Sequence, residues 1–254
     1  MNLALQGHCI LLTRSLTQSK KTAAEIQSHG GESLVLACME CVVLSAEIQR
    51  GWHLLQKKSP AWVLFTSVNA LESLESTLGS NFVLELKRHT VLAVGEKTAD
   101  FLHEAGIKHV LVPQEHSQEG LLSMMLALTL PKQLFFFRAE KARNFLQQSL
   151  IEQGVEVFAV MSYQMQCPQS DATTVLSALK EGQVDAVLLG SPQTVRHYLR
   201  RTIDIRIANN ALLVAISPRV AETATSLGLK VSLVSKEANF SSMLMSLHHY
   251  FEGK

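Results

Sequence analysis

The stretch LAVGEKTADFLHEAGIKHVLVPQEHSQEGLL, residues 92–122, decides the fold because the chain contains a second version of it. Residues 214–244 read VAISPRVAETATSLGLKVSLVSKEANFSSML and align with it, without a gap, at a constant spacing of 122 residues. The identical pairs include Ala93/Ala215, Ala99/Ala221, Gly106/Gly228, Lys108/Lys230, Val112/Val234, Glu115/Glu237 and Leu122/Leu244. Each copy has an apolar run, a turn, a helix ended by glycine, a second apolar run and a polar loop that caps another helix. Each copy therefore predicts a strand-helix-strand-helix unit.

Two further blocks repeat in the same order, at spacings of up to 124 residues. The predicted strand Cys9–Thr13, helix Thr17–His29 and strand start Ser33–Ala37 return as strand Leu134–Arg138, helix Lys141–Gln153 and strand Val155–Val160. The predicted strand Trp62–Thr66, with a helix start at Ser67, returns as Ala186–Leu189 with Ser191-Pro192. Serine at the cap and proline at the first helical position are typical helix starts. Three blocks repeated in order indicate an internal duplication.

The alternation of strands and helices predicts the fold class. The strands are continuous apolar runs, which indicates parallel sheets covered by helices on both faces. We therefore predict an α/β protein with two similar doubly wound parallel-sheet lobes of Rossmann or flavodoxin type. The periodic pattern stops in Met161–Asp171, which a proline interrupts, so this segment is predicted to be a linker. The segment Ala37–Val42 is a candidate for its partner.

Composition limits the classes of function. The chain has 254 residues, of which 47% are hydrophobic and 18% charged, and a formal charge of +1. This charge gives no basic field for nucleic-acid binding, and no run of 18 apolar residues predicts a membrane span. The start MNLALQGHCILLTRS lacks the features of a signal peptide. We expect a cytoplasmic monomer that binds neither nucleic acid nor membrane.

Cysteines and histidines give weak evidence for a metal or redox site. Four cysteines without a disulfide pattern fit a reducing compartment. Cys38 and Cys41 form a C-x-x-C, but no second pair or suitably spaced histidines accompany it, so chance is favoured and the role of the two cysteines stays open. The sequence contains no H-E-x-x-H and no Gly-rich phosphate loop. We therefore predict no metal and no cofactor.

Candidate binding residues lie in the turns from strand to helix, because ligands of open α/β sheets bind at the carboxyl ends of the strands. These turns contain hydroxyls, small residues and arginines, at Arg14, Ser67, Asn69, Gly95, Thr98, Arg138, Ser191 and Ser217. Each has a purely structural alternative: the serines and Thr98 suit helix caps, the arginines suit surface ion pairs, and Tyr163 suits packing. No Ser-His-Asp grouping accompanies them, so we predict binding through backbone amides, in a cleft that all these turns face.

These residues resemble the uroporphyrinogen-III synthase family over nearly the whole chain. The resemblance is carried by Leu11-Leu12-Thr13-Arg14, Phe65-Thr66-Ser67-Val68-Asn69-Ala70, Ala93-Val94-Gly95-Glu96-Lys97-Thr98-Ala99, Arg138 with Arg143, Tyr163 with Pro168, Ser191-Pro192, and Pro218 with Ala221. The second half departs from the family pattern: Arg138-Ala139 replaces Arg-Gly, Leu189-Gly190-Ser191-Pro192-Gln193 replaces Phe-Thr-Ser-Pro-Ser, and Ser217-Pro218-Arg219-Val220-Ala221 replaces Gly-Pro-x-Thr-Ala. Whether Ala139, Gly190, Gln193, Ser217 and Val220 lower activity is left open.

The resemblance implies a division of the chain that the duplication alone does not. It implies one discontinuous lobe of residues 1–36 with 169–254, and an inserted lobe of residues 42–162. The hinge strands are then about 37–41 and 163–168. A simple duplication would instead divide the chain near Pro131.

The resemblance also implies a function. The family enzyme is a cofactor-free hydro-lyase of haem biosynthesis, which cyclises hydroxymethylbilane with loss of water and inversion of the terminal pyrrole ring. On this basis Tyr163 is the predicted acid, because a phenol keeps its proton at neutral pH. Substrate carboxylates are predicted to bind at Arg14, Ser67, Asn69, Gly95, Thr98, Arg138, Ser191 and Ser217. A transient contact with the preceding pathway enzyme is left open, and the alternative is a catalytically degenerate bilobed protein that binds a tetrapyrrole or another small anion.

Overall fold

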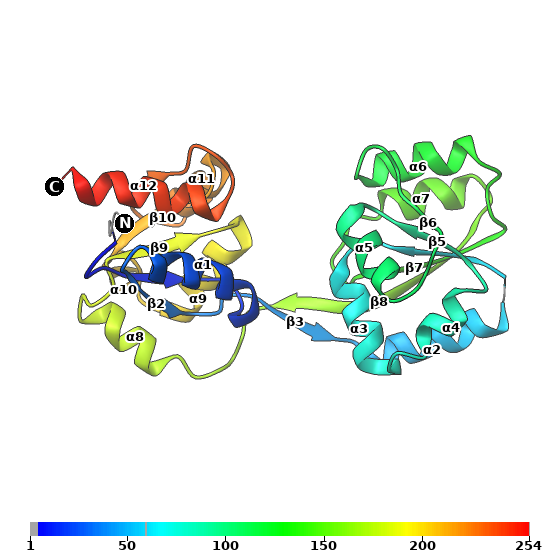
Figure 1. The fold of residues 1–254 in the computed structure, drawn as a ribbon, viewed down its shortest axis with the longest axis horizontal. Coiled ribbons are helices and arrows are strands. Elements are labelled where there is room, and N and C mark those ends of the chain that lie inside the picture. Colours follow the sequence, from blue (N-terminus) through cyan, green and yellow to red (C-terminus); the bar gives the residue numbers. More distant parts are fainter. Residues whose placement is uncertain (1–4, 59, 254) are drawn as a thin grey trace. The chain divides into compact units, whose positions relative to one another are not determined.

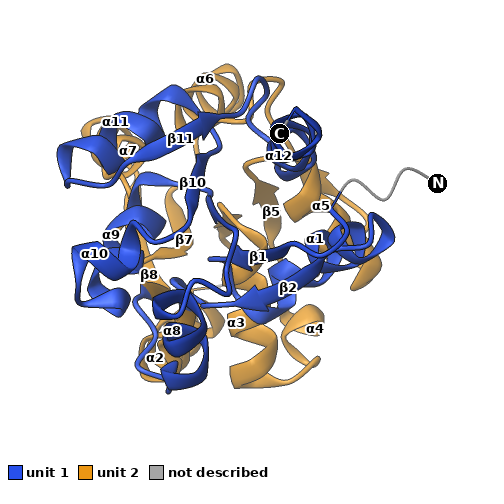
Figure 2. Cartoon of the chain, turned by 90° about the vertical axis from the view of Figure 1, so that its left-hand side faces the viewer, with its two compact units in different colours: residues 1–40, 166–254 blue, residues 41–165 orange. Residues whose placement is uncertain are grey.

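The computed structural model describes residues 5–58 and 60–253. The chain forms two compact units, Met1–Glu40 with Gln166–Lys254 (unit 1) and Cys41–Met165 (unit 2), which Figure 2 shows in blue and orange. The chain leaves unit 1 at the start of β3 (Glu40–Val43) and returns at the end of β8 (Glu156–Gln166). The action of these two connections as a hinge stays a prediction.

Unit 1 is built on a five-stranded sheet in the order β11-β10-β9-β1-β2, and all its neighbouring strands are parallel. The strands are β1 (Cys9–Leu12), β2 (Glu32–Val35), β9 (Ala186–Leu189), β10 (Leu212–Ala215) and β11 (Val231–Val234). The helices are α1 (Leu16–Ser28), α8 (Thr173–Lys180), α9 (Pro192–Thr202), α10 (Ile205–Ala208), α11 (Pro218–Ser226) and α12 (Phe240–Glu252). Residues of α1 and α12 pack with Ile10 and Leu12 of β1, whereas residues of α8, α9 and α11 pack with Leu11 of the same strand. The sheet is therefore covered on both faces, as Figure 1 shows.

Unit 2 is built on a six-stranded sheet in the order β3-β8-β7-β4-β5-β6. Its other strands are β4 (Trp62–Phe65), β5 (Thr90–Ala93), β6 (Val110–Leu111) and β7 (Gln133–Ala139), and the strands from β4 to β8 pair in parallel. The helices are α2 (Ser45–Lys57), α3 (Val68–Leu78), α4 (Phe82–Leu86), α5 (Glu96–Glu104), α6 (Gln118–Ala127) and α7 (Phe145–Glu152). The first four helices pack with Phe65 and Phe137, and α6 and α7 pack with Leu64 and Phe136. The predicted α/β class with doubly covered parallel sheets is confirmed.

The two sheets have the same strand order once the repeated blocks are matched. The order β2-β1-β9-β10-β11 in unit 1 corresponds to β8-β7-β4-β5-β6 in unit 2. The chain therefore runs through unit 2 as a circular permutation of unit 1, which is the pattern that a duplication with an exchanged boundary leaves. In both sheets the direction of winding reverses once, between β1 and β9 and between β7 and β4. Ligands of such folds bind outside the carboxyl ends of the strands at this switch point.

The repeated stretch forms the predicted elements in both copies. In the first copy β5 leads to α5, which Gly106 follows two residues after its end, and then to β6 and to α6, which Ser117 caps. In the second copy β10 leads to α11, which Gly228 follows two residues after its end, and then to β11 and to α12, which Asn239 caps. Gly106 and Gly228 have φ angles of 96° and 84°. Glycine adopts these angles without a steric cost from Cβ, which explains its place at both helix ends.

Two predicted elements differ from the structure. The helix predicted over Lys141–Gln153 begins at Phe145, because Arg138 binds acceptors in the preceding loop and holds that loop out of the helix. The linker predicted over Met161–Asp171 is strand as far as Gln166, because β8 pairs with β7 as far as Tyr163 and has β3 as its neighbour on the other side. No helix in residues 5–58 and 60–253 is long and apolar enough to cross a membrane.

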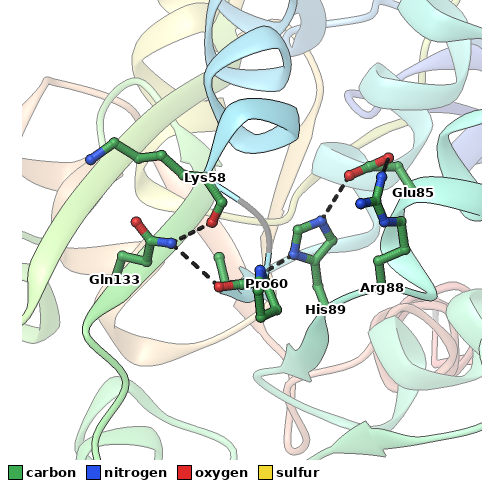
Figure 3. A network of polar contacts seen from close by, with 7 residues as sticks. Lys58, Pro60, Glu85, Arg88, His89 and Gln133 are labelled. Carbon is green, nitrogen blue, oxygen red and sulfur yellow. Dashed lines mark hydrogen bonds and ion pairs between the residues drawn. The ribbon is translucent and has the colours of Figure 1, made fainter.

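A network of hydrogen bonds and ion pairs lies at the amino ends of β4, β5 and β7 and includes Glu85, His89 and Gln133 (Figure 3). The Ala61 amide donates to His89 Nδ1 at 3.1 Å, so the proton of the neutral ring is on Nε2, which lies 3.2 Å from Glu85 Oε1. Gln133 Nε2 donates to the carbonyls of Lys58 and Pro60. The His89 side chain is fully buried, and this burial lowers the pKa of its imidazole despite the favourable contact with Glu85.

The buried His89 should make the stability of the protein depend on pH. Its pKa is lower in the folded state than in the unfolded state, so the unfolded chain takes up a proton first as the pH falls. Its contribution to stability is complete above an unfolded pKa of about 6.5 and decreases as the pH falls through that value. Urea unfolding between pH 7.5 and 5 should show this decrease in the wild type and a smaller one in His89→Gln, whose amide accepts and donates without titrating. Equal pH slopes in both proteins would contradict the prediction.

Candidate active site

The carboxyl edge of the second sheet brings Tyr163 to Ser67. Ser67 follows β4 and caps α3, where its Oγ accepts from the Ala70 amide at 3.3 Å. Tyr163 lies near the end of β8, on the far side of β7, and its hydroxyl is 2.9 Å from Ser67 Oγ. The Tyr163 side chain is 7% exposed, so the phenol is held in a nearly closed environment. Asn69, in the first turn of α3, has its Nδ2 3.9 Å from Met165 Sδ.

A bulge in β8 turns Tyr163 toward Ser67. Phe158 and Val160 pack on the face covered by α2 to α5, so regular alternation would place Tyr163 on the opposite face. The register between β7 and β8 shifts after Arg138, and Ala139 pairs with Tyr163 instead of Ser162. Such a shift moves the next side chain to the other face of the sheet. Tyr163 therefore joins the core on the same face as α3.

Gly95 and Thr98 form the start of α5 after β5. The Gly95 carbonyl accepts from the Thr98 amide at 3.1 Å, and Thr98 is only 4% exposed. No described residue hydrogen-bonds to the Thr98 hydroxyl, so this group is available to a ligand. A Cβ at Gly95 would lie 3.1 Å from His116 Cγ, so any larger residue there would have to move this histidine slightly. His116 was not among the predicted site residues, since a single histidine in a polar loop gives no sequence signal for such a contact.

Arg138 is part of the structure of its own loop. Its side chain is 3% exposed and donates to Asn144 Oδ1 at 2.9 Å, to Gln147 Oε1 at 3.1 Å and to the Ala142 carbonyl. Loss of solvent around the guanidinium lowers its pKa, although an arginine remains charged at neutral pH. With its donors engaged in this way, Arg138 is better suited to positioning the loop than to clamping a substrate carboxylate.

Arg14 is the corresponding residue of unit 1, and its arrangement is different. Its Nε donates to Gln18 Oε1 at 3.2 Å, and its guanidinium carbon lies 4.8 Å from the ring centre of Phe240. The side chain is half-buried, and this partial loss of solvent lowers its pKa. No acceptor among the described residues binds either Nη group. The structure thus distinguishes two arginines that the repeat makes equivalent: both Nη groups of Arg138 donate hydrogen bonds, whereas those of Arg14 donate to no residue in the described ranges.

Ser191 and Ser217 precede α9 and α11, and proline follows each of them. Ser191 Oγ accepts from the Thr194 amide at 3.1 Å and lies 2.8 Å from Thr194 Oγ1, so it acts as a cap. Ser217 has the position of a cap, but its side chain makes no cap hydrogen bond. Among the residues that the structure describes, its hydroxyl has no partner.

Gln193, one of the departures from the family pattern, has a structural contact. Its Nε2 lies 2.7 Å from Nε2 of the buried His197, whose Nδ1 is 2.6 Å from the Cys38 carbonyl. Because a carbonyl only accepts, Nδ1 carries the proton and Nε2 accepts from Gln193. Gln193 therefore helps to orient the His197 ring, which donates to the Cys38 carbonyl. Cys38 is buried and Cys41 is exposed, and both are free thiols.

The groups at these two carboxyl edges are suited to binding carboxylates. They comprise the amides at the starts of α3, α5, α9 and α11, the hydroxyls of Thr98 and Ser217, and the Nη groups of Arg14. No residue in the described ranges hydrogen-bonds to these hydroxyls or Nη groups. Tyr163 adds a proton donor beside Ser67. In residues 5–58 and 60–253 no three histidine, cysteine or acidic side chains are grouped so that they could hold a metal ion.

Comparisons with known proteins show the family of the chain. The family described as uroporphyrinogen-III synthase HemD matches residues 20–245. A uroporphyrinogen-III synthase of Synechococcus elongatus is 26% identical over 260 aligned residues, which cover 97% of this chain and 96% of the relative.

Solved structures of uroporphyrinogen-III synthases have the same fold as this chain. A uroporphyrinogen-III synthetase of Helicobacter pylori gives a TM-score of 0.64 at 18% identity, covering 94% of this chain and 97% of the other. A mutant uroporphyrinogen III synthase of Thermus thermophilus gives 0.57 at 20% identity, covering 97% and 100%. The family match spans most of the chain, and the chain belongs to the uroporphyrinogen-III synthase HemD family.

Proposed function

We propose that this protein is a uroporphyrinogen-III synthase, a hydro-lyase that closes the linear tetrapyrrole hydroxymethylbilane with loss of water and inversion of the terminal pyrrole ring. The observation that carries the proposal is the family match over residues 20–245. The pairing of Tyr163 with Ser67 at the carboxyl edge of the second sheet supports it, because the reaction begins by removing a hydroxyl group that needs a proton to leave as water.

The reaction requires an acid at the terminal hydroxyl of the substrate. It also requires that the substituted α-carbon of the last ring be placed close to the carbon that becomes cationic. Protonation of the terminal hydroxyl releases water and leaves a delocalised azafulvene cation. The substituted α-carbon of the last ring then attacks this cation, which gives a spiro intermediate that fragments and closes again with that ring inverted. The ring proton lost when aromaticity returns balances the proton given to the leaving group. Closure through the unsubstituted carbon would give the unrearranged ring, so the enzyme acts largely by positioning.

Tyr163 is the proposed acid. Ser67 Oγ accepts from the Ala70 amide and is also within hydrogen-bond distance of the phenol. When the Ser67 hydroxyl donates to Tyr163, the phenol proton is free to go to the substrate. General acid catalysis of this kind contributes about 10² to 10⁴ in rate. Because the side chain is nearly buried, few water molecules compete for that proton.

The substrate carboxylates are proposed to bind at six of the eight residues that the sequence indicated; the other two, Ser67 and Arg138, are engaged with Tyr163 and with the loop after β7. In unit 2 these are Gly95, Thr98 and Asn69, through the amides of α5 and α3 and the free Thr98 hydroxyl. In unit 1 they are Arg14, Ser191 and Ser217, through the free Nη groups of Arg14 and the amides of α9 and α11. Carboxylates are stabilised at helix starts by unpaired N–H groups and by the helix dipole.

An isomer assay tests the function. The purified protein is given hydroxymethylbilane, and the cyclic products are oxidised and separated by chromatography. We expect the inverted isomer far above the spontaneous background, and a lower rate in Thr98→Ala than in Thr98→Ser, which keeps the hydroxyl. Formation of the unrearranged ring alone, at the rate without protein, would refute the proposal and favour the alternative of a non-catalytic anion-binding protein.

A further inference from the structure

The switch point of the first sheet contains an aromatic residue, Phe240, which packs beside Arg14. Phe240 is the first residue of α12, and its half-buried ring lies between two turns that follow the neighbouring strands β1 and β9. The Arg14 guanidinium lies over the ring face at 4.8 Å, and Gly190 lies against the Cζ end of the ring. Three segments that are far apart in the sequence thus meet at the edge where ligands of such sheets bind.

Gly190 provides the space for this ring. A Cβ at position 190 would lie 2.9 Å from Phe240 Cζ, a distance that side-chain carbons essentially never show. The φ angle of Gly190 is not among the positive ones, so the backbone does not require glycine there. Glycine at this position therefore lets the ring keep its place, whereas an added methyl group would displace it.

Phe240 and Gln18 together fix the guanidinium of Arg14. The guanidinium carbon of Arg14 lies over the Phe240 ring, 4.8 Å from its centre, and Gln18 Oε1 accepts from Arg14 Nε at 3.2 Å. A guanidinium can stack on a ring and keep its edge free, because stacking uses the face and hydrogen bonds use the edge. The two Nη groups donate to no residue in the described ranges. Such a pair of N–H donors can bind a carboxylate in bidentate fashion.

We infer that Phe240 is a positioning residue of this site, which holds the Arg14 guanidinium so that its Nη groups receive one carboxylate of the linear tetrapyrrole. The inference rests on the proposed function. Without the ring, Arg14 would regain the rotational freedom of a long side chain and lose part of it again on binding. The ring thus strengthens substrate binding and leaves the chemistry at Tyr163 unchanged.

The test is a set of variants measured by steady-state kinetics in the isomer assay. Phe240→Leu keeps apolar volume beside Gly190 and removes the aromatic face. We expect its KM to rise about 3- to 10-fold, as is typical of a lost cation–π contact, with kcat within about twofold of the wild type. Arg14→Ala should raise KM further. Adding Phe240→Leu to Arg14→Ala should have little additional effect, because both changes act on the same contact between Arg14 and the substrate carboxylate. Met245→Ala, an exposed residue of the same helix, is the matched control and should change neither constant.

Gly190→Ala provides a second test that keeps the ring. The added methyl group must push Phe240 away, so KM should rise, and the same change in the Phe240→Leu background should have a smaller effect because leucine leaves more room. Thermal unfolding of each variant shows whether it is folded at the assay temperature. An active wild type with unchanged KM in folded Phe240→Leu and Gly190→Ala overturns this inference and leaves the proposed function intact. A wild type that forms only the unrearranged ring overturns the proposed function and this inference with it.

Discussion

Replacing Tyr163 with phenylalanine should lower kcat at least about 100-fold while KM changes by less than about threefold. The change removes one oxygen atom, which lies 2.9 Å from Ser67 Oγ, and leaves the ring in the core formed with Phe137 and Val160. The rate of loss of the terminal hydroxyl falls because no other acid is held at that atom. The carboxylates are bound elsewhere, so substrate affinity is kept. Stopped-flow or quenched assays with separation of the product isomers would measure both constants.

The control for this prediction is the stability of the variant. A neutral hydrogen bond contributes about 1 kcal/mol to folding, so Tyr163→Phe should unfold at only a slightly lower urea concentration than the wild type. A folded variant with unchanged kcat would remove Tyr163 from the role of acid. Ser67→Ala should slow the reaction less, because water can replace its hydroxyl beside Tyr163 but nothing replaces the phenol.

Replacing Arg138 with alanine should lower the free energy of unfolding by roughly 3 kcal/mol. The guanidinium is almost fully buried, and its removal leaves the Ala142 carbonyl, Asn144 Oδ1 and Gln147 Oε1 without their donor. Hydrogen bonds from a charged donor contribute more than neutral ones, and Arg138 makes three of them to partly buried acceptors. Arg138→Lys should recover part of the loss, because an ammonium group cannot reach all three acceptors in one geometry.

Arg143→Ala is the matched control for Arg138. Arg143 lies in the same loop, is mostly exposed and pairs with Glu119, so its removal should cost less than about 1 kcal/mol. Urea unfolding of both variants gives the comparison. Equal midpoints for Arg138→Ala and Arg143→Ala would show that the buried contacts do not stabilise the loop. A loss of activity in Arg138→Ala at temperatures where it stays folded would be consistent with displacement of the loop beside Tyr163.

The fold was predictable because its signals are local and occur twice. Continuous apolar runs such as Trp62–Phe65, followed by a capping serine, predict a buried parallel strand and a helix start without knowledge of the neighbours. The loop after Arg138 was not predictable in the same way. Residues 141–144 have a pattern compatible with a helix, and the side chain that prevents helix formation comes from the preceding strand.

The site was partly predictable for a similar reason. Gly95, Thr98, Ser67 and Ser217 are found from their place at helix starts, and the structure places them at the carboxyl edges of their sheets. The different use of Arg14 and Arg138 was beyond the sequence, because the two residues occupy equivalent positions in the repeat. Their difference arises from their partners: Arg14 lies over the ring of Phe240, and its Nη groups bind no described residue. Ala142 and Asn144 bind Nη2 of Arg138, and Gln147 binds its Nη1.

The sequence by itself determined the duplication, the strand and helix pattern, the parallel sheets and the turns in which binding residues lie, because these depend on periodicity and on capping within a few residues. Tertiary structure alone decided which side chains meet. The register shift after Arg138 turns Tyr163 toward Ser67, and glycine at position 190 leaves room for the ring of Phe240. Both depend on how separate strands and helices pack, and a contact between residues 96 positions apart leaves no periodic signal in the chain.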